Sequence, residues 1–262
     1  MRKCLIFRVI FFALLQTHLG MEYALQKSMA YLPRYAIVCD GSCFHVTWQC
    51  HNKEWLLKDD WAKQFYYDLL LKYKDKHGIQ FHSYQLMENH PHLTGTLSTL
   101  EEFSAFFRVV NNLFARKYNQ RKQRRGQVVM DRFKSPRIQD DVYMLRAMAY
   151  GDLNGVRCGR DKLPEEAKWS SYAYYAYGKE DPLITPAVSY LALGETAEKR
   201  RRAYSGMVQE LIKQDKINIS NTCFIGDPDW VKKQYEGLMS EIRNIFLLRE
   251  LKKSSSTTAG AP

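Results

Sequence analysis

The chain lacks the features that mark membrane proteins and disulfide-stabilised secreted domains. Beyond its first twenty residues, no apolar run approaches the length needed to cross a bilayer. Its six cysteines are scattered among 262 residues without a paired framework, which favours reduced thiols in a cytoplasmic protein. There is no internal repeat and no excess of acidic residues. At 262 residues, the chain is expected to form one well-packed domain with an appended subdomain.

The N-terminal segment resembles a secretory signal only in part. Residues 1–20 combine a basic start with an apolar stretch, but Arg8 interrupts that stretch and no small-residue cleavage site follows. Met21 and Met29 both precede the first convincing domain pattern. We therefore expect residues 1–28 to be an extension from a mis-called start codon, with export as the alternative.

Basic residues outnumber acidic ones. Lys and Arg total 39 against 28 Asp and Glu, which gives a formal net charge of +11. This excess favours a polyanionic partner when it lies on a folded face. Charge alone does not distinguish DNA, RNA and an acidic membrane surface.

The spacing of apolar residues predicts an α+β fold. Strand-like segments alternate apolar and polar residues, and helix-like segments place apolar residues three or four apart. In chain order they cover residues 35–51 (a strand pair), 61–76 (helix), 79–87 (strand), 91–97 (strand) and 101–118 (helix). This order is that of a split ferredoxin-like domain. We expect an antiparallel sheet with helices packed on one face, plus a C-terminal helical extension.

Two short motifs bring together side chains that suit metal-assisted chemistry. In His90-Pro91-His92 the imidazoles are two residues apart, so in a strand they point to the same side. Two neutral imidazoles at this spacing can hold a divalent ion, although the pattern alone is more often a solvated pair. Tyr150 and Asn154 are four residues apart, which stacks a phenol and a carboxamide on one helical face. The amide oxygen is a candidate third ligand.

Several motifs occur in order along the chain: FHVTWQCHN (44–52), LMENHPHLTG (86–95), DRFKS (131–135), YGDLNGVRCG (150–159) and WSSY (169–172). Together they resemble the HUH-type single-tyrosine transposases of the IS200-like group, in particular the branch associated with repetitive extragenic palindromes. The resemblance covers roughly residues 29–178.

The resemblance implies that His90 and His92 bind Mg²⁺ or Mn²⁺, that Asn154 completes the site, and that Tyr150 is the nucleophile. It also implies a strand transferase that cleaves and rejoins single-stranded or hairpin DNA through a 5′-phosphotyrosine. The chemistry is consistent with this, because a phenol has a pKa of about 10 and needs a nearby cation to become an effective nucleophile.

A cationic run lies between the histidine motif and the tyrosine motif. Its side chains would bind phosphates, and Tyr118 would stack on unpaired bases, although a plain solvated face is the alternative. The expected DNA contacts are Arg116, Lys117, Tyr118, Arg121, Lys122, Arg124, Arg125, Arg132 and Lys134.

We expect a transposase domain over residues 29–178, a helical region over 179–250 and a disordered tail over 251–262. The expected setting is the cytoplasm and its nucleoid, without a membrane partner and with a homodimer as one option. Two alternatives stay open. A non-catalytic hairpin-binding relative is favoured by two departures from the family pattern, Pro91 inside the histidine motif and Gly155 where the branch usually has proline. A basic RNA-binding module with structural histidines is the second.

Overall fold

The computed structural model describes residues 33–139, 141–213 and 222–241. The predicted extension at 1–28 and the predicted tail at 251–262 lie outside the described residues. The chain forms one compact unit up to Ile225 and a second from Gly226 onward. In the second unit, residues 228–241 are helical. The predicted boundary after residue 178 stays a prediction.

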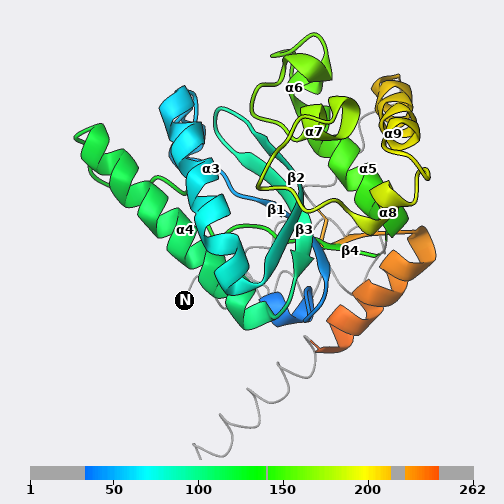
Figure 1. Cartoon of the computed structure of the whole chain (residues 1–262). Coiled ribbons are helices and arrows are strands. Elements are labelled where there is room, and N and C mark those ends of the chain that lie inside the picture. Colours follow the sequence, from blue (N-terminus) through cyan, green and yellow to red (C-terminus); the bar gives the residue numbers. More distant parts are fainter. Residues whose placement is uncertain (1–32, 140, 214–221, 242–262) are drawn as a thin grey trace, which may run out of the picture. The chain divides into compact units, whose positions relative to one another are not determined.

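The first unit is built on a five-stranded sheet with the order β2-β3-β1-β4-β5 (Figure 1). The strands are β1 (Cys43–Thr47), β2 (Ile79–Leu86), β3 (Pro91–Leu97), β4 (Arg137–Ile138) and β5 (Phe224–Ile225). Pairing is antiparallel from β2 across to β4, and β4 pairs with β5 in parallel. The predicted α+β, ferredoxin-like class is confirmed, with a short parallel pair added at one edge.

In the first unit, α3 (Asp60–Lys74) and α4 (Leu100–Arg121) follow the predicted order of strands and helices. Between β4 and β5 the chain forms α5 (Asp141–Asp152), α6 (Asn154–Arg157), α7 (Tyr172–Tyr177), α8 (Val188–Leu191) and α9 (Ala197–Ile212). Short 3-10 turns lie at Arg34–Ala36, His51–Lys53, Asp75–His77 and Pro164–Glu166. The strand pair predicted around Asp40-Gly41 is wrong, because the structure forms a 3-10 turn before these residues and a single strand, β1, after them.

One face of the sheet is apolar and packs on α3 and α4. Phe44 of β1 lies with its ring centroid 6.2 Å from that of Phe81 of β2 and 4.8 Å from that of Phe103 of α4. All three rings are fully buried. The Thr99 hydroxyl accepts a hydrogen bond from the Glu102 amide and so caps the start of α4. This is the helix-covered face that the sequence predicted.

The opposite face of the sheet is polar, and α5 packs on it against β2 and β3 (Figure 1). The strand register aligns Gln85, His92, Thr47 and Lys134 in one row across four strand segments, and Thr94 pairs with His45 in the next row. Residues directly opposite each other in antiparallel strands point to the same face. Helices therefore cover both faces of the sheet. The sequence predicted the face that α3 and α4 cover, and the structure adds α5 on the other face.

Candidate active site

Tyr150 of α5 faces two histidines of the polar sheet face. Its ring centroid lies 5.8 Å from that of His92 on β3 and 6.2 Å from that of His45 on β1, both in edge-to-face geometry. Tyr150 is 7% exposed and His92 3% exposed. The structure thus brings the predicted nucleophile to one of the predicted metal ligands.

The two histidines of the motif lie together at the β2-β3 turn. Their ring centroids are 4.8 Å apart at an interplanar angle of 74°. Pro91 is the first residue of β3 and pairs with Leu86, while the Met87 amide donates to the His90 carbonyl oxygen at 3.0 Å. The first residue of a strand is one of the positions where proline is tolerated. The departure at Pro91 is therefore compatible with the hairpin that presents the imidazoles.

Burial keeps the imidazoles of His90 and His45 neutral. It lowers the pKa of His90 to about 4 and the pKa of His45 to about 3. A metal ion binds the neutral form of histidine through a ring nitrogen lone pair. At neutral pH these side chains are therefore in the form that can bind a metal.

Asn154 lies just after the tyrosine helix. α5 ends at Asp152 and α6 begins at Asn154, but the Leu153 amide still donates to the Ala149 carbonyl, so the helical path continues. Asn154 is 7% exposed, and its carboxamide nitrogen is buried without a hydrogen-bond partner in the described part of the chain. An amide nitrogen is a hydrogen-bond donor, so in this buried position it calls for an acceptor or a water, not for a cation.

The predicted ligands have the donor chemistry of a divalent-ion site. The imidazoles of His90 and His92 and the carboxamide of Asn154 would supply a mixed nitrogen and oxygen donor set. Such a set suits Mn²⁺ better than Mg²⁺, which prefers oxygen ligands. Within the described ranges there is no group of three or more His, Cys, Asp and Glu side chains that could hold a metal ion; the predicted set contains only two such residues.

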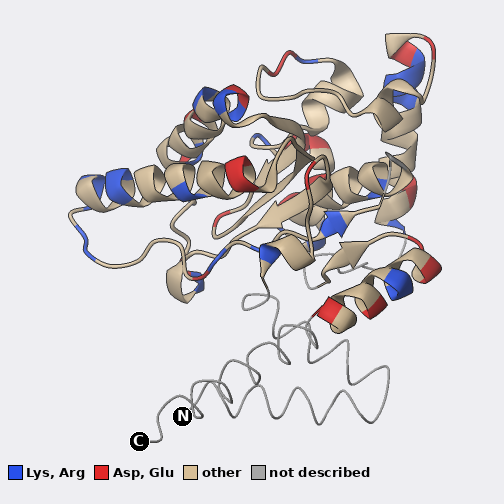
Figure 2. Ribbon diagram, turned by 90° about the horizontal axis from the view of Figure 1, so that it is seen from below, with Lys and Arg blue, Asp and Glu red and all other residues tan. Residues whose placement is uncertain are grey.

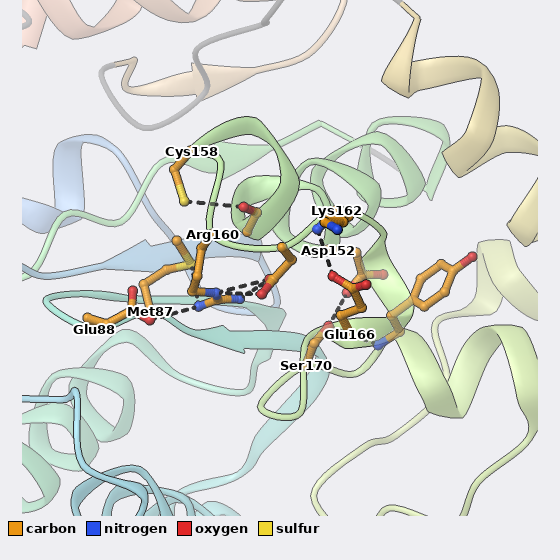
Figure 3. Close-up of polar contacts among 11 residues, drawn as sticks. Met87, Glu88, Asp152, Cys158, Arg160, Lys162, Glu166 and Ser170 are labelled. Atoms are coloured by element: carbon orange, nitrogen blue, oxygen red, sulfur yellow. Dashed lines mark hydrogen bonds and ion pairs between the residues drawn. The ribbon is translucent and has the colours of Figure 1, made fainter.

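Gly155 and Arg160 connect the tyrosine side of the site with the histidine side. A Cβ atom at Gly155 would collide with the side chains of Arg160 and Asp161, which pair with each other. Arg160 also donates to the Met87 sulfur at 3.4 Å and lies 3.6 Å from a Glu88 carboxylate oxygen (Figure 3). The glycine thus makes room for a loop that contacts the turn carrying His90.

Arg157 is a cation that the sequence analysis did not single out. Its guanidinium carbon lies 5.6 Å from the centroid of the Tyr150 ring. One terminal nitrogen, Nη2, donates to the Leu211 carbonyl oxygen at 3.3 Å, and the other, Nη1, is buried without a partner among the described residues. This places a positive charge with an unused donor beside the phenol.

Asp152 is a second residue that the sequence analysis missed, two positions after Tyr150. It is 1% exposed and accepts a hydrogen bond from the Ser170 hydroxyl at 2.9 Å (Figure 3). It also accepts hydrogen bonds from the Tyr204 hydroxyl at 2.6 Å and the Ser171 hydroxyl at 3.4 Å. Burial raises its pKa to about 7, against the opposing effect of these three donors. The cluster fixes the end of α5 to α9 and to the segment before α7.

The predicted DNA contacts fall into separate places. Lys and Arg gather at the C-terminal end of α4 and in the loop that follows it (Figure 2). Arg116 and Lys117 line a groove of about 740 Å³ beside α3, and Lys134 lies across Thr47 from His92. The side chains of Arg116, Lys117, Arg121, Lys122, Arg125 and Arg132 are exposed, and those of Arg124 and Lys134 are half-buried.

Tyr118 is placed differently from the expected base platform. It is 6% exposed and stacks on Trp61 at a centroid distance of 5.4 Å. The guanidinium carbon of Arg121 lies 4.5 Å from the centroid of the Trp61 ring. Lys122 pairs with Asp59 at 2.7 Å. In this arrangement Tyr118 supports Trp61, which is the more accessible of the two rings.

In the comparison with family models, the model described as "Transposase IS200 like" matches residues 40–135. This confirms the resemblance seen in the sequence over that segment. The match includes both predicted histidine ligands and ends before Tyr150.

Two solved structures are similar to this chain at low identity. A REP-associated tyrosine transposase bound to a REP hairpin is 17% identical, with 61% of this chain and 94% of that chain covered and a TM-score of 0.45. A transposase candidate from Deinococcus radiodurans R1 is 14% identical, with 40% and 85% covered and a TM-score of 0.33. None of the curated proteins matches this chain. No helix in the described ranges is both long and apolar enough for a membrane span.

Proposed function

We propose that this protein is a DNA strand transferase that cleaves and rejoins single-stranded or hairpin DNA through a 5′-phosphotyrosine intermediate, with a divalent metal ion. The observation that carries the proposal is the contact between the Tyr150 ring and the buried His92 ring at 5.8 Å. The family match adds support, because it covers the histidine motif and belongs to transposases.

Tyr150 supplies the nucleophile in this proposal. Its phenolic oxygen attacks a DNA phosphorus and forms a new phosphorus–oxygen bond, while the bond from that phosphorus to the 3′ oxygen of the preceding nucleotide breaks. The phenol gives up its proton, and the departing 3′ oxygen gains one. Since one phosphodiester replaces another, a 3′ hydroxyl can later attack the phosphotyrosine and rejoin the strand without ATP.

The other residues of the site bind and orient the reacting groups. His90, His92 and Asn154 would hold the ion, which would supply positive charge to a non-bridging phosphate oxygen. Arg157 lies close enough to the Tyr150 ring to donate through its unpartnered nitrogen to the same phosphate once it is bonded to the tyrosine. Neutralising the charge of the phosphate favours the attack, because the phosphate and the deprotonating phenol of Tyr150 otherwise repel each other.

The basic surface would hold the DNA. The exposed cations at the end of α4 suit the phosphate backbone, and Lys134 adds a cation in the sheet row that contains His92. Trp61, which contacts both Tyr118 and Arg121, offers a partly accessible aromatic ring at the same end of α4.

The test is formation of a covalent protein–DNA species. The full chain is incubated with end-labelled hairpin DNA carrying single-stranded flanks, with and without Mn²⁺, and is then run on a denaturing gel. We expect a metal-dependent adduct. Hairpin binding without an adduct would support the non-catalytic alternative, and tighter binding of RNA than of DNA would support the RNA-binding alternative.

A further inference from the structure

His45 is a fully buried imidazole in the middle of β1 that neither the predicted metal site nor the proposed chemistry uses. Its Nε2 lies 3.0 Å from His92 Nδ1 in a hydrogen bond, and the two rings stack at a centroid distance of 5.2 Å and an interplanar angle of 13°. It also contacts the Tyr150 ring. His45 therefore touches both a predicted ligand and the predicted nucleophile.

The hydrogen bond restricts how His92 can bind an ion. Because Nδ1 of His92 is engaged by His45, an ion can be bound only through Nε2. That requires the His92 proton to be on Nδ1, from where it is donated to Nε2 of a neutral His45. The opposite arrangement, in which His45 donates, puts the His92 proton on Nε2 and blocks that nitrogen.

The neighbouring histidine shows the same arrangement. Nδ1 of His90 lies 2.6 Å from the side-chain oxygen of Asn89, so this nitrogen carries the proton and Nε2 of His90 is the metal-binding nitrogen. Both histidines of the motif thus use Nδ1 for an orienting hydrogen bond. In protein metal sites the partner of the second ring nitrogen fixes the tautomer and the ring orientation of the ligand.

We propose that His45 is a positioning residue that holds His92 in the tautomer and orientation needed to bind the divalent ion through Nε2. This rests on the proposed function for the presence of an ion at His92. It assigns a role to a histidine that lies 47 residues away in sequence and on a different strand.

Two substitutions separate positioning from simple core packing. His45→Phe keeps a planar ring against His92 and removes the acceptor, whereas His45→Gln replaces the ring with a side chain whose amide oxygen can accept the same hydrogen bond. Loss of such an outer partner costs roughly 10- to 100-fold in metal affinity. We expect His45→Phe to weaken Mn²⁺ binding by this factor and His45→Gln to stay much closer to the wild type. If His45 only filled space, His45→Gln would weaken Mn²⁺ binding more than His45→Phe, because phenylalanine is the better mimic of the imidazole ring.

The experiment is a Mn²⁺ titration of the full-length protein followed by electron paramagnetic resonance, with melting curves of each variant as the control for folding. Unchanged Mn²⁺ affinity in a folded His45→Phe variant would overturn the inference while leaving the proposed function intact. Wild-type protein that binds Mn²⁺ but forms no DNA adduct would overturn the proposed function and leave the inference about His45 intact. Wild-type protein that binds no Mn²⁺ overturns both the metal site and the inference.

A second measurement does not depend on the variants folding. ¹⁵N NMR of histidine-labelled wild-type protein loaded with diamagnetic Zn²⁺, an ion that imidazole binds well, reports which nitrogen of His92 carries the proton. We expect protonated Nδ1. A His92 protonated at Nε2 in the loaded protein contradicts the inference.

Discussion

Replacement of Asp152 by asparagine should remove a pH dependence from the stability of the protein. The carboxylate is fully buried at the end of α5, and burial raises its pKa from an ordinary value of 3.8 to about 7. Because the folded pKa lies above the unfolded one, the stabilisation from the bound proton is complete below pH ~4 and is lost as the pH rises to about 7. A difference of about three pH units corresponds to a loss on the order of 4 kcal/mol.

The assay compares wild type and Asp152→Asn by thermal unfolding at a series of pH values from 4 to 8. Other titrating groups are the same in both proteins, so the difference between the two melting temperatures isolates Asp152. For a unit of this size, 4 kcal/mol corresponds to roughly 8 to 16 °C. We expect the wild type to lose this much relative to the variant across the series. A difference that does not change with pH would refute the reasoning, because it would mean that the three hydroxyl donors cancel the effect of burial on the pKa of Asp152.

Three further predictions concern the site and the basic surface. His90→Ala or His92→Ala should abolish Mn²⁺-dependent cleavage and leave hairpin binding largely intact in a gel-shift assay; undiminished cleavage in both would remove the metal assignment. Arg157→Ala should slow adduct formation by more than tenfold, because it removes the proposed charged hydrogen bond to the phosphate. The control Arg146→Ala removes the cation beside Tyr143 and should not slow adduct formation. Equal effects of the two substitutions would argue against a specific role of Arg157. Neutralising Arg121, Lys122, Arg124 and Arg125 together should lower the slope of log K against log salt by up to about 3, at roughly 0.7 per phosphate contact; an unchanged slope would mean that this run only faces solvent.

The sequence predicted the apolar half of the fold well. Phe44, Phe81 and Phe103 belong to segments whose spacing is typical of a strand or an amphipathic helix, and burying them against each other requires the sheet face and the helices to meet. Local periodicity contains this information because each apolar stripe must be covered by another element.

The polar face could not be predicted in the same way. His45 alternates with apolar neighbours and therefore has the pattern of a solvent-facing strand position, yet it is fully buried once α5 covers it. Its contact with His92 joins residues 47 positions apart. Arg157 and Asp152 are recognised only when the folded chain brings them to Tyr150, α9 and the serines before α7. The motif resemblance supplied His90, His92, Asn154 and Tyr150, and their roles stay predictions.

Tyr143 is the alternative to Tyr150 as the nucleophile. Tyr143 lies on the same helix as Tyr150, seven residues earlier and about 10 Å away along the axis at 1.5 Å per residue. Tyr143 has Arg146 over its ring, whereas Tyr150 contacts both His45 and His92. Tyr→Phe at either position removes one hydroxyl and little packing.

The most direct measurement is therefore the yield of covalent adduct from Tyr150→Phe and Tyr143→Phe, each incubated with end-labelled hairpin DNA and Mn²⁺ and resolved on a denaturing gel. We predict that Tyr150→Phe binds the hairpin and forms no adduct, and that Tyr143→Phe forms it at the wild-type level. An adduct that persists in Tyr150→Phe, or a wild-type protein that binds the hairpin without ever forming one, would contradict the assignment of Tyr150 as the nucleophile of a strand transferase.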